Sequence, residues 1–126
     1  MINLLAVGTG GFVGAVARYL LSSLVHRALS AAFPYGTLVV NVVGCLAIGA
    51  LMYFVEDRGT LGPGARLFLG IGILGGFTTF SSFSHETIEL VARGQTGLAA
   101  LNVAGSVVLG LGAVWAGRAL MRAVGA

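Results

Sequence analysis

The sequence predicts an all-α membrane protein in which four helices cross the bilayer. Of its 126 residues, 57% are hydrophobic and only 9% are charged, whereas soluble domains carry about 25% charged residues. The mean hydropathy is +0.99. A soluble protein of this composition would expose large apolar patches and aggregate. We therefore expect an integral membrane protein that is surrounded by lipid.

Four segments have the length of about 20 mostly apolar residues that a membrane-spanning helix needs. They cover residues 4–25, 36–55, 65–91 and 98–121, with short connections between them. No connection has room for a separate domain, so we expect a single four-helix transmembrane domain, residues 1–126. The apolar run at the N-terminus has no basic stretch before it and is not typical of a cleaved signal peptide.

The third segment is expected to be interrupted within the membrane. It contains the run Gly75-Gly76-Phe77-Thr78-Thr79-Phe80, in which a glycine pair and two adjacent threonines are poor helix formers. Non-helical backbone at membrane depth is tolerated only where it is buried in protein or lines a cavity. The interruption is therefore predicted to lie at such a place.

Glycines elsewhere have the spacing of close helix contacts. Gly10 and Gly14 on the first segment, and Gly72 and Gly76 on the third, are four residues apart, as in helix pairs that approach closely in membranes. We favour packing within one chain over a dimer motif for each pair.

Several function classes are disfavoured. The seven basic residues are all arginines and the net charge is +3, but they form no basic face of the kind that binds nucleic acid. The histidines and Cys45 lack the spacing of metal ligands, and no nucleophile–base motif is present. The run Gly70-Ile-Gly72-Ile-Leu-Gly75 has glycine spacing of a dinucleotide site but lacks the preceding strand. We predict no enzyme and no nucleic-acid partner.

Polar groups on the first two segments have two interpretations each. Arg18 is either an anchor at the membrane interface or a positive group near an anion vestibule, because an arginine in the membrane centre is costly. Thr37 and Asn41 share a helix face. They either form interhelical hydrogen bonds or line a polar path.

The third and fourth segments carry a second set of such residues. Phe80 and Phe83 lie one turn apart and either pack in the core or present their electropositive ring edges to a small anion. Glu86 is the deep carboxylate, which relays protons, orients neighbours or pairs with an arginine. Asn102 and Ser106 share a face of the fourth helix and either extend a polar track or bond neighbouring helices.

The arginines give little indication of orientation. Four of them, Arg58, Arg66, Arg118 and Arg122, fall on the side of the N-terminus, and two, or three with Arg18, fall on the other side. The positive-inside rule therefore does not select one orientation.

These residues resemble the Fluc (CrcB) fluoride channel family. The similarity lies in Gly75-Gly76-Phe77-Thr78-Thr79-Phe80-Ser81-Ser82-Phe83 followed by Ser84-x-Glu86-Thr87, in Gly36-Thr37 with Asn41 and Gly44, and in Gly11, Gly14 and Arg18. It covers nearly the whole chain in order. Leu98 departs from it, because some relatives have an aromatic residue there.

The resemblance implies an antiparallel, dual-topology homodimer that conducts fluoride passively across the inner (plasma) membrane and confers fluoride resistance. It implies a structural Na⁺ ion at the dimer interface, held by the backbone carbonyls of Gly75 and Thr78. Arg18 takes the place of the family's first-helix arginine. The anion pore it implies consists of Phe80, Phe83, Asn41, Thr37, Glu86, Ser106 and Asn102.

Two other functions stay open at this stage. A small proton-coupled multidrug-type exporter is also a four-helix, dual-topology dimer, but its chemistry calls for a carboxylate on the first helix, where this chain has none. A subunit without transport activity would spread its polar residues for packing, without a continuous line through Thr37, Asn41, Phe80, Phe83 and Glu86.

Overall fold

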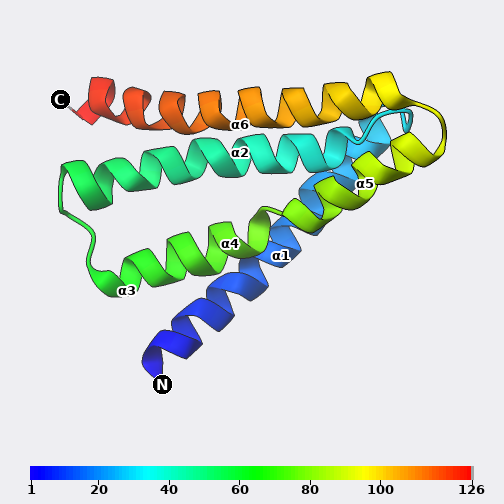
Figure 1. Cartoon of the computed structure of the whole chain (residues 1–126). Coiled ribbons are helices and arrows are strands. Elements are labelled where there is room, and N and C mark those ends of the chain that lie inside the picture. Colours follow the sequence, from blue (N-terminus) through cyan, green and yellow to red (C-terminus); the bar gives the residue numbers. More distant parts are fainter. Residues whose placement is uncertain (126) are drawn as a thin grey trace.

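The computed structural model describes residues 1–125, and these residues form helices joined by short connections (Figure 1). The elements are α1 (Ile2–Ala28), α2 (Tyr35–Met52) with its π-helical continuation η1 (Tyr53–Asp57), α3 (Pro63–Arg66), the π-helical η2 (Leu67–Leu74), α4 (Gly75–Phe77), α5 (Phe80–Ala92) and α6 (Thr96–Gly125).

Four helical units are long and apolar enough to cross a membrane, which confirms the four predicted spans. They run over residues 2–28, 35–57, 63–92 and 96–125. Each is longer than the apolar segment that predicted it, because backbone hydrogen bonding continues into the polar residues at its ends. Helix-breaking residues then limit the helical units. Pro63 lies at the start of the third unit, and Gly94, with a φ of 75°, separates the third unit from the fourth.

The helices pair in two groups. In Figure 1, α2 and α6 lie side by side along most of their length, and α1 crosses obliquely past α4 and α5. Glycines allow both contacts, because a Cβ atom at Gly117 would overlap the Leu46 carbonyl of α2, and one at Gly14 would overlap the Ile73 carbonyl of η2. A Cβ at Gly10 would lie 2.9 Å from the Gly72 Cα. The spaced glycines thus serve contacts within this chain.

Ion pairs join the end of the second unit to the end of the fourth. Asp57 in η1 pairs with Arg118 and, at 2.6 Å, with Arg122 of α6. Glu56 lies 3.0 Å from Arg118. Two of the arginines that enter the orientation count are therefore matched by carboxylates of the same chain.

Helical backbone stops at Thr78 and Thr79, between α4 and α5. Thr78 has φ −80° and ψ 156° and Thr79 has φ −149° and ψ 115°, which is extended backbone. The Thr78 N–H still donates to the Leu74 carbonyl, at 3.0 Å. The Thr79 hydroxyl then accepts the Ser82 N–H at 3.2 Å and caps α5, as threonine often does at a helix start.

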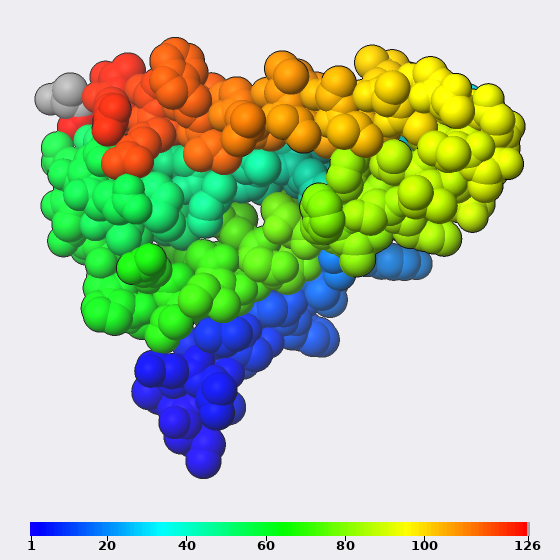
Figure 2. Space-filling view, viewed as in Figure 1, coloured from blue at the N-terminus to red at the C-terminus, as the bar shows by residue number. Residues whose placement is uncertain are grey.

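The interior of the single chain is small and its outside is apolar. Fully buried large side chains are few, whereas Phe12, Leu111 and Trp115 are 72%, 69% and 75% exposed. Figure 2 shows a hollow between the α2–α6 pair and the third unit. An exterior of this kind belongs against lipid or another protein chain.

Candidate functional site

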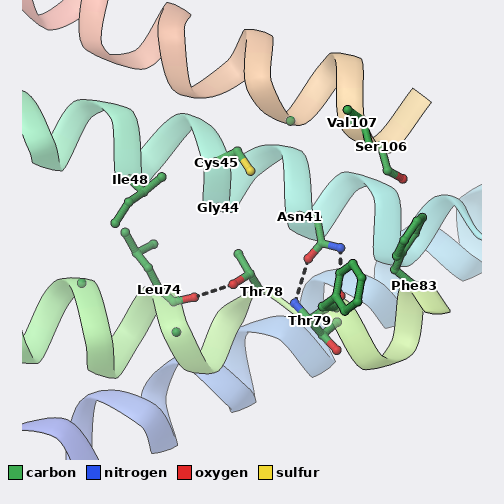
Figure 3. Close-up of a pocket in the computed structure, with 14 residues that line it drawn as sticks. Asn41, Gly44, Cys45, Ile48, Leu74, Thr78, Thr79, Phe83, Ser106 and Val107 are labelled. Atoms are coloured by element: carbon green, nitrogen blue, oxygen red, sulfur yellow. Dashed lines mark hydrogen bonds between the residues drawn. The ribbon is translucent and has the colours of Figure 1, made fainter. Parts of the chain in front are cut away.

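One pocket lies where α2, the third unit and α6 face one another (Figure 3). It has a volume of about 430 Å³. Six of the residues singled out in the sequence line it: Asn41, Gly75, Thr78, Phe80, Phe83 and Ser106. We call this pocket the groove.

Asn41 of α2 holds the extended residues in place. Its Nδ2 donates to the Thr79 carbonyl at 3.0 Å, and its Oδ1 accepts the Thr79 N–H at 2.8 Å. Figure 3 shows both bonds. An amide has two N–H groups, so one remains to face the groove, and within residues 1–125 it has no hydrogen-bond partner. The interhelical bond and the polar lining are therefore compatible roles of one side chain.

The same bond frees a backbone carbonyl. In an uninterrupted helix the Thr79 N–H would donate to the Gly75 carbonyl four residues earlier, but here it donates to Asn41. The Thr78 carbonyl accepts only a long bond, 3.5 Å, from Arg18 Nη1, and a carbonyl has two acceptor positions. Carbonyl oxygens at the end of a half-helix suit a monovalent cation. The donor set of Gly75 and Thr78 thus fits the ion that the resemblance implies.

Three of the four phenylalanines in the third unit, Phe77, Phe80 and Phe83, lie at or after its interruption, and they differ in burial. Phe77 is 8% exposed and belongs to the core, whereas Phe80 is 78% exposed. The rings of Phe80 and Phe83 are 5.5 Å apart between centroids and tilted by 45°. Core packing within this chain therefore accounts for Phe77 but not for Phe80.

Thr37, Glu86 and Arg18 lie in a second pocket, on the α1 side of the third unit. Thr37 donates its hydroxyl to Glu86 Oε1 at 2.7 Å. Glu86 Oε2 is buried and has no hydrogen-bond partner among residues 1–125. We call this pocket, of about 330 Å³, the inner pocket. Thr79 lines both it and the groove.

The expected single line of polar residues is therefore divided. Asn41, Phe80 and Phe83 face the groove, and Thr37 and Glu86 face the inner pocket. The extended residues Thr78 and Thr79 pass between them, so residues on one face of α2 meet different surroundings.

Asn102 lines neither of these two pockets, and it makes the kind of interhelical bond that was the second interpretation of this residue. It is 2% exposed and donates to the Thr87 hydroxyl at 2.9 Å, which joins α6 to α5. A buried amide is retained where it finds such a partner. Its role in the described structure is to hold two helices together.

The sequence predicted Thr79 only as part of the interruption and not as a site residue, although it bonds to Asn41 and lines both pockets. A signal was present, because a threonine directly before an apolar helical run is a preferred helix cap. Cys45 is half-buried and also lines the groove.

Taken together, four membrane-spanning helices around polar pockets make this a multi-pass membrane protein. A family model described as "CrcB-like protein, Camphor Resistance (CrcB)" matches residues 5–118. The chain belongs to this family, which is a family of ion channels and not a class of enzymes.

Curated relatives match the sequence of this chain along almost their full length. A protein of Agrobacterium fabrum named "Fluoride-specific ion channel FluC" is 48% identical over 122 residues, 97% of this chain and 98% of its own length. Proteins of the same name are 48% identical in Solibacter usitatus, over 94% of this chain and 97% of their own, and 45% identical in Rhizobium etli, over 98% and 99%.

Proposed function

We infer that this chain forms a fluoride-selective channel that exports fluoride passively and confers resistance to it. The observation that carries the inference is the match along nearly the whole chain to relatives named fluoride-specific ion channels. The groove adds a physical rationale, because it combines few polar donors with an apolar wall and holds no fixed cationic side chain in its lining.

Fluoride is small and strongly hydrated, so a pore has to replace its water with donors. The groove offers the remaining N–H of Asn41, the Ser106 hydroxyl and the electropositive ring edges of Phe80 and Phe83. A row of weak sites lets an ion enter and leave. Thr37, whose hydroxyl is engaged by Glu86, and Glu86 itself would serve a connected part of the path in the inner pocket, where Arg18 supplies positive potential.

We propose that two chains assemble as an antiparallel homodimer in the inner membrane. The exposed Phe80 in an open groove supports this, because a second copy would close the groove and cover the ring. The small difference in arginine number between the two sides is compatible with insertion in both orientations.

The interruption would lie at the middle of the membrane, since Thr78 and Thr79 fall near the centre of the helical unit 63–92. There the carbonyls of Gly75 and Thr78, with their equivalents in the second copy, would hold a Na⁺ ion at the dimer interface. A bound cation supplies a structural link between subunits and positive potential for an anion pathway.

A proton-coupled exporter is not supported by these observations. The first helix α1 carries no carboxylate, and the relatives are named for fluoride. Glu86, the deep carboxylate, already accepts the Thr37 hydroxyl.

The test is fluoride efflux from proteoliposomes, followed with a fluoride electrode, with chloride as the control anion. We expect rapid fluoride efflux and negligible chloride efflux. Equal rates for the two anions, or no efflux above that of protein-free liposomes, would refute the channel. Uptake of a cationic drug driven by a proton gradient would favour the exporter instead.

A further inference from the structure

A third pocket lies beyond Glu86, at the end of the molecule where α1 and α5 finish and α2 begins. It has a volume of about 250 Å³, and the titratable residues in its lining are His26, His85, Glu86, Glu89 and Arg93. The loop residues Phe33 and Pro34 complete the wall. We call it the outer basin. It shares Glu86 with the inner pocket, so the two adjoin along one side chain.

We propose that the outer basin binds small inorganic anions when its two imidazoles are protonated, and so collects anions for the pathway in a pH-dependent way. This proposal rests on the proposed function for the transport step. The binding step stands on the basin alone.

The fixed charges of the basin nearly cancel. Arg93 lies 3.4 Å from Glu89, and Glu86 Oε1 accepts the Thr37 hydroxyl. One guanidinium against two carboxylates leaves a formal charge of −1 while both imidazoles are neutral, and protonation of both changes it to +1. Histidine is the side chain that ordinarily changes charge between about pH 5 and 8. The sign of the basin therefore depends on His26 and His85.

His26 lies at the amino end of α2. A Cβ at Gly36 would overlap the His26 ring, so this ring lies directly against the first turn of α2. His26 Nδ1 lies 2.7 Å from the Ser22 carbonyl, which suits an N–H at that nitrogen and leaves Nε2 to take the second proton. The amino end of a helix carries a partial positive charge, which adds to that of an imidazolium.

Other titratable groups near by do not belong to the lining. Arg27 follows His26 on α1, and Tyr35 begins α2, but the lining contains neither. The groups that line the basin with His26 come from α5, namely His85, Glu86 and Glu89, and from Arg93, which caps that helix. The proposal thus concerns a site distinct from the groove, and of its titratable residues the family resemblance assigns only Glu86.

The size of the effect follows from Coulomb's law. Two added charges at about 10 Å in water raise the local anion concentration about fourfold, and one raises it about twofold. We expect wild-type fluoride efflux, corrected for protein-free liposomes, to be about fourfold faster at pH 5.5 than at pH 7.5. The ratio falls to about two in His85→Gln and to about one in the double variant His26→Gln/His85→Gln.

A binding measurement separates this proposal from the channel itself. Proton titration of ¹⁵N-histidine-labelled protein is followed by NMR with fluoride, with chloride and with neither. Anions that bind to protonated imidazoles should shift the two ring signals at low pH with either salt, also in Phe80→Ile, where we expect little efflux. Absence of any shift, or a double variant that keeps the wild-type pH ratio, would overturn the proposal. If efflux fails at both pH values but the shift is present, the channel is refuted and the basin stands.

Discussion

Replacing Asn41 with alanine removes both hydrogen bonds that hold Thr79 in extended backbone. Thr79 is 8% exposed, so its N–H and carbonyl lose their partners away from water. A buried polar group left unpaired costs about 1–3 kcal/mol, and an interhelical hydrogen bond in a membrane contributes about 0.6 kcal/mol on average. The N–H has one other acceptor within reach, the Gly75 carbonyl of a continuous helix. We therefore expect a loss of about 1–3 kcal/mol, together with a helix that closes over the cation site.

Two measurements read out these effects. Thermal unfolding in detergent is compared in sodium chloride and in choline chloride, because an ion that binds only the folded state raises its stability. Wild type should be more stable in sodium, and Asn41→Ala should show no difference between the salts. Fluoride efflux should also fall, because the variant lacks the second N–H of the Asn41 amide, which is a proposed donor to the ion.

The matched control is Asn102→Ala. It removes a more deeply buried amide and its bond to Thr87 but leaves the extended residues intact, so it should lower stability while keeping the sodium effect and the efflux. If Asn41→Ala retains wild-type efflux and the sodium effect, then the bond to Thr79 does not create the cation site and this reasoning is wrong.

Three further substitutions test other parts of the structure. Phe80→Ile should reduce fluoride efflux by at least about tenfold, because it removes a ring edge from the path, and should leave thermal stability in detergent nearly unchanged. Phe12→Ile, at a similarly exposed site on α1, should change neither efflux nor stability. Normal efflux in Phe80→Ile would exclude the ring from the path. Gly14→Ala should cost about 1–3 kcal/mol by overpacking against the Ile73 carbonyl, measured by thermal unfolding, whereas Gly8→Ala, where an added Cβ meets nothing within 4 Å, should not destabilise. Thr37→Val should slow efflux and lower stability by about 1–3 kcal/mol, because Glu86 loses its hydrogen-bond donor. Thr37→Ser should retain wild-type efflux and stability. Equal behaviour of the valine and serine variants would show that the hydroxyl is unimportant.

The number of helices could be predicted from the sequence, because apolar length is a local property. The packing glycines could also be predicted, since Gly10 and Gly14, like Gly72 and Gly76, have the spacing of close helix contacts. Spacing alone does not identify the partner helix. The structure supplies that partner within the same chain.

The grouping of the polar residues could not be predicted from helix faces. Thr37 and Asn41 are one turn apart on α2, and this spacing places them on one face. They reach different pockets because extended backbone from the third unit passes between them. Likewise, Phe77 and Phe80 lie only three residues apart along the chain. The change of backbone direction at Thr78 nevertheless leaves the Phe77 ring buried and the Phe80 ring exposed. Such differences arise from tertiary placement, which periodicity does not contain.

The position of Thr79 as a common wall has a thermodynamic consequence. Its backbone bonds to Asn41 on the groove side, the residue also lines the inner pocket together with Arg18, and its N–H donates to Asn41 and not to the Gly75 carbonyl. Occupancy of the proposed cation site and occupancy of the proposed anion path would therefore both act on this one residue. Coupling free energies are reciprocal: if sodium strengthens anion binding, then fluoride strengthens sodium binding by the same factor. One residue would then make the cation and the transported anion allosteric effectors of each other.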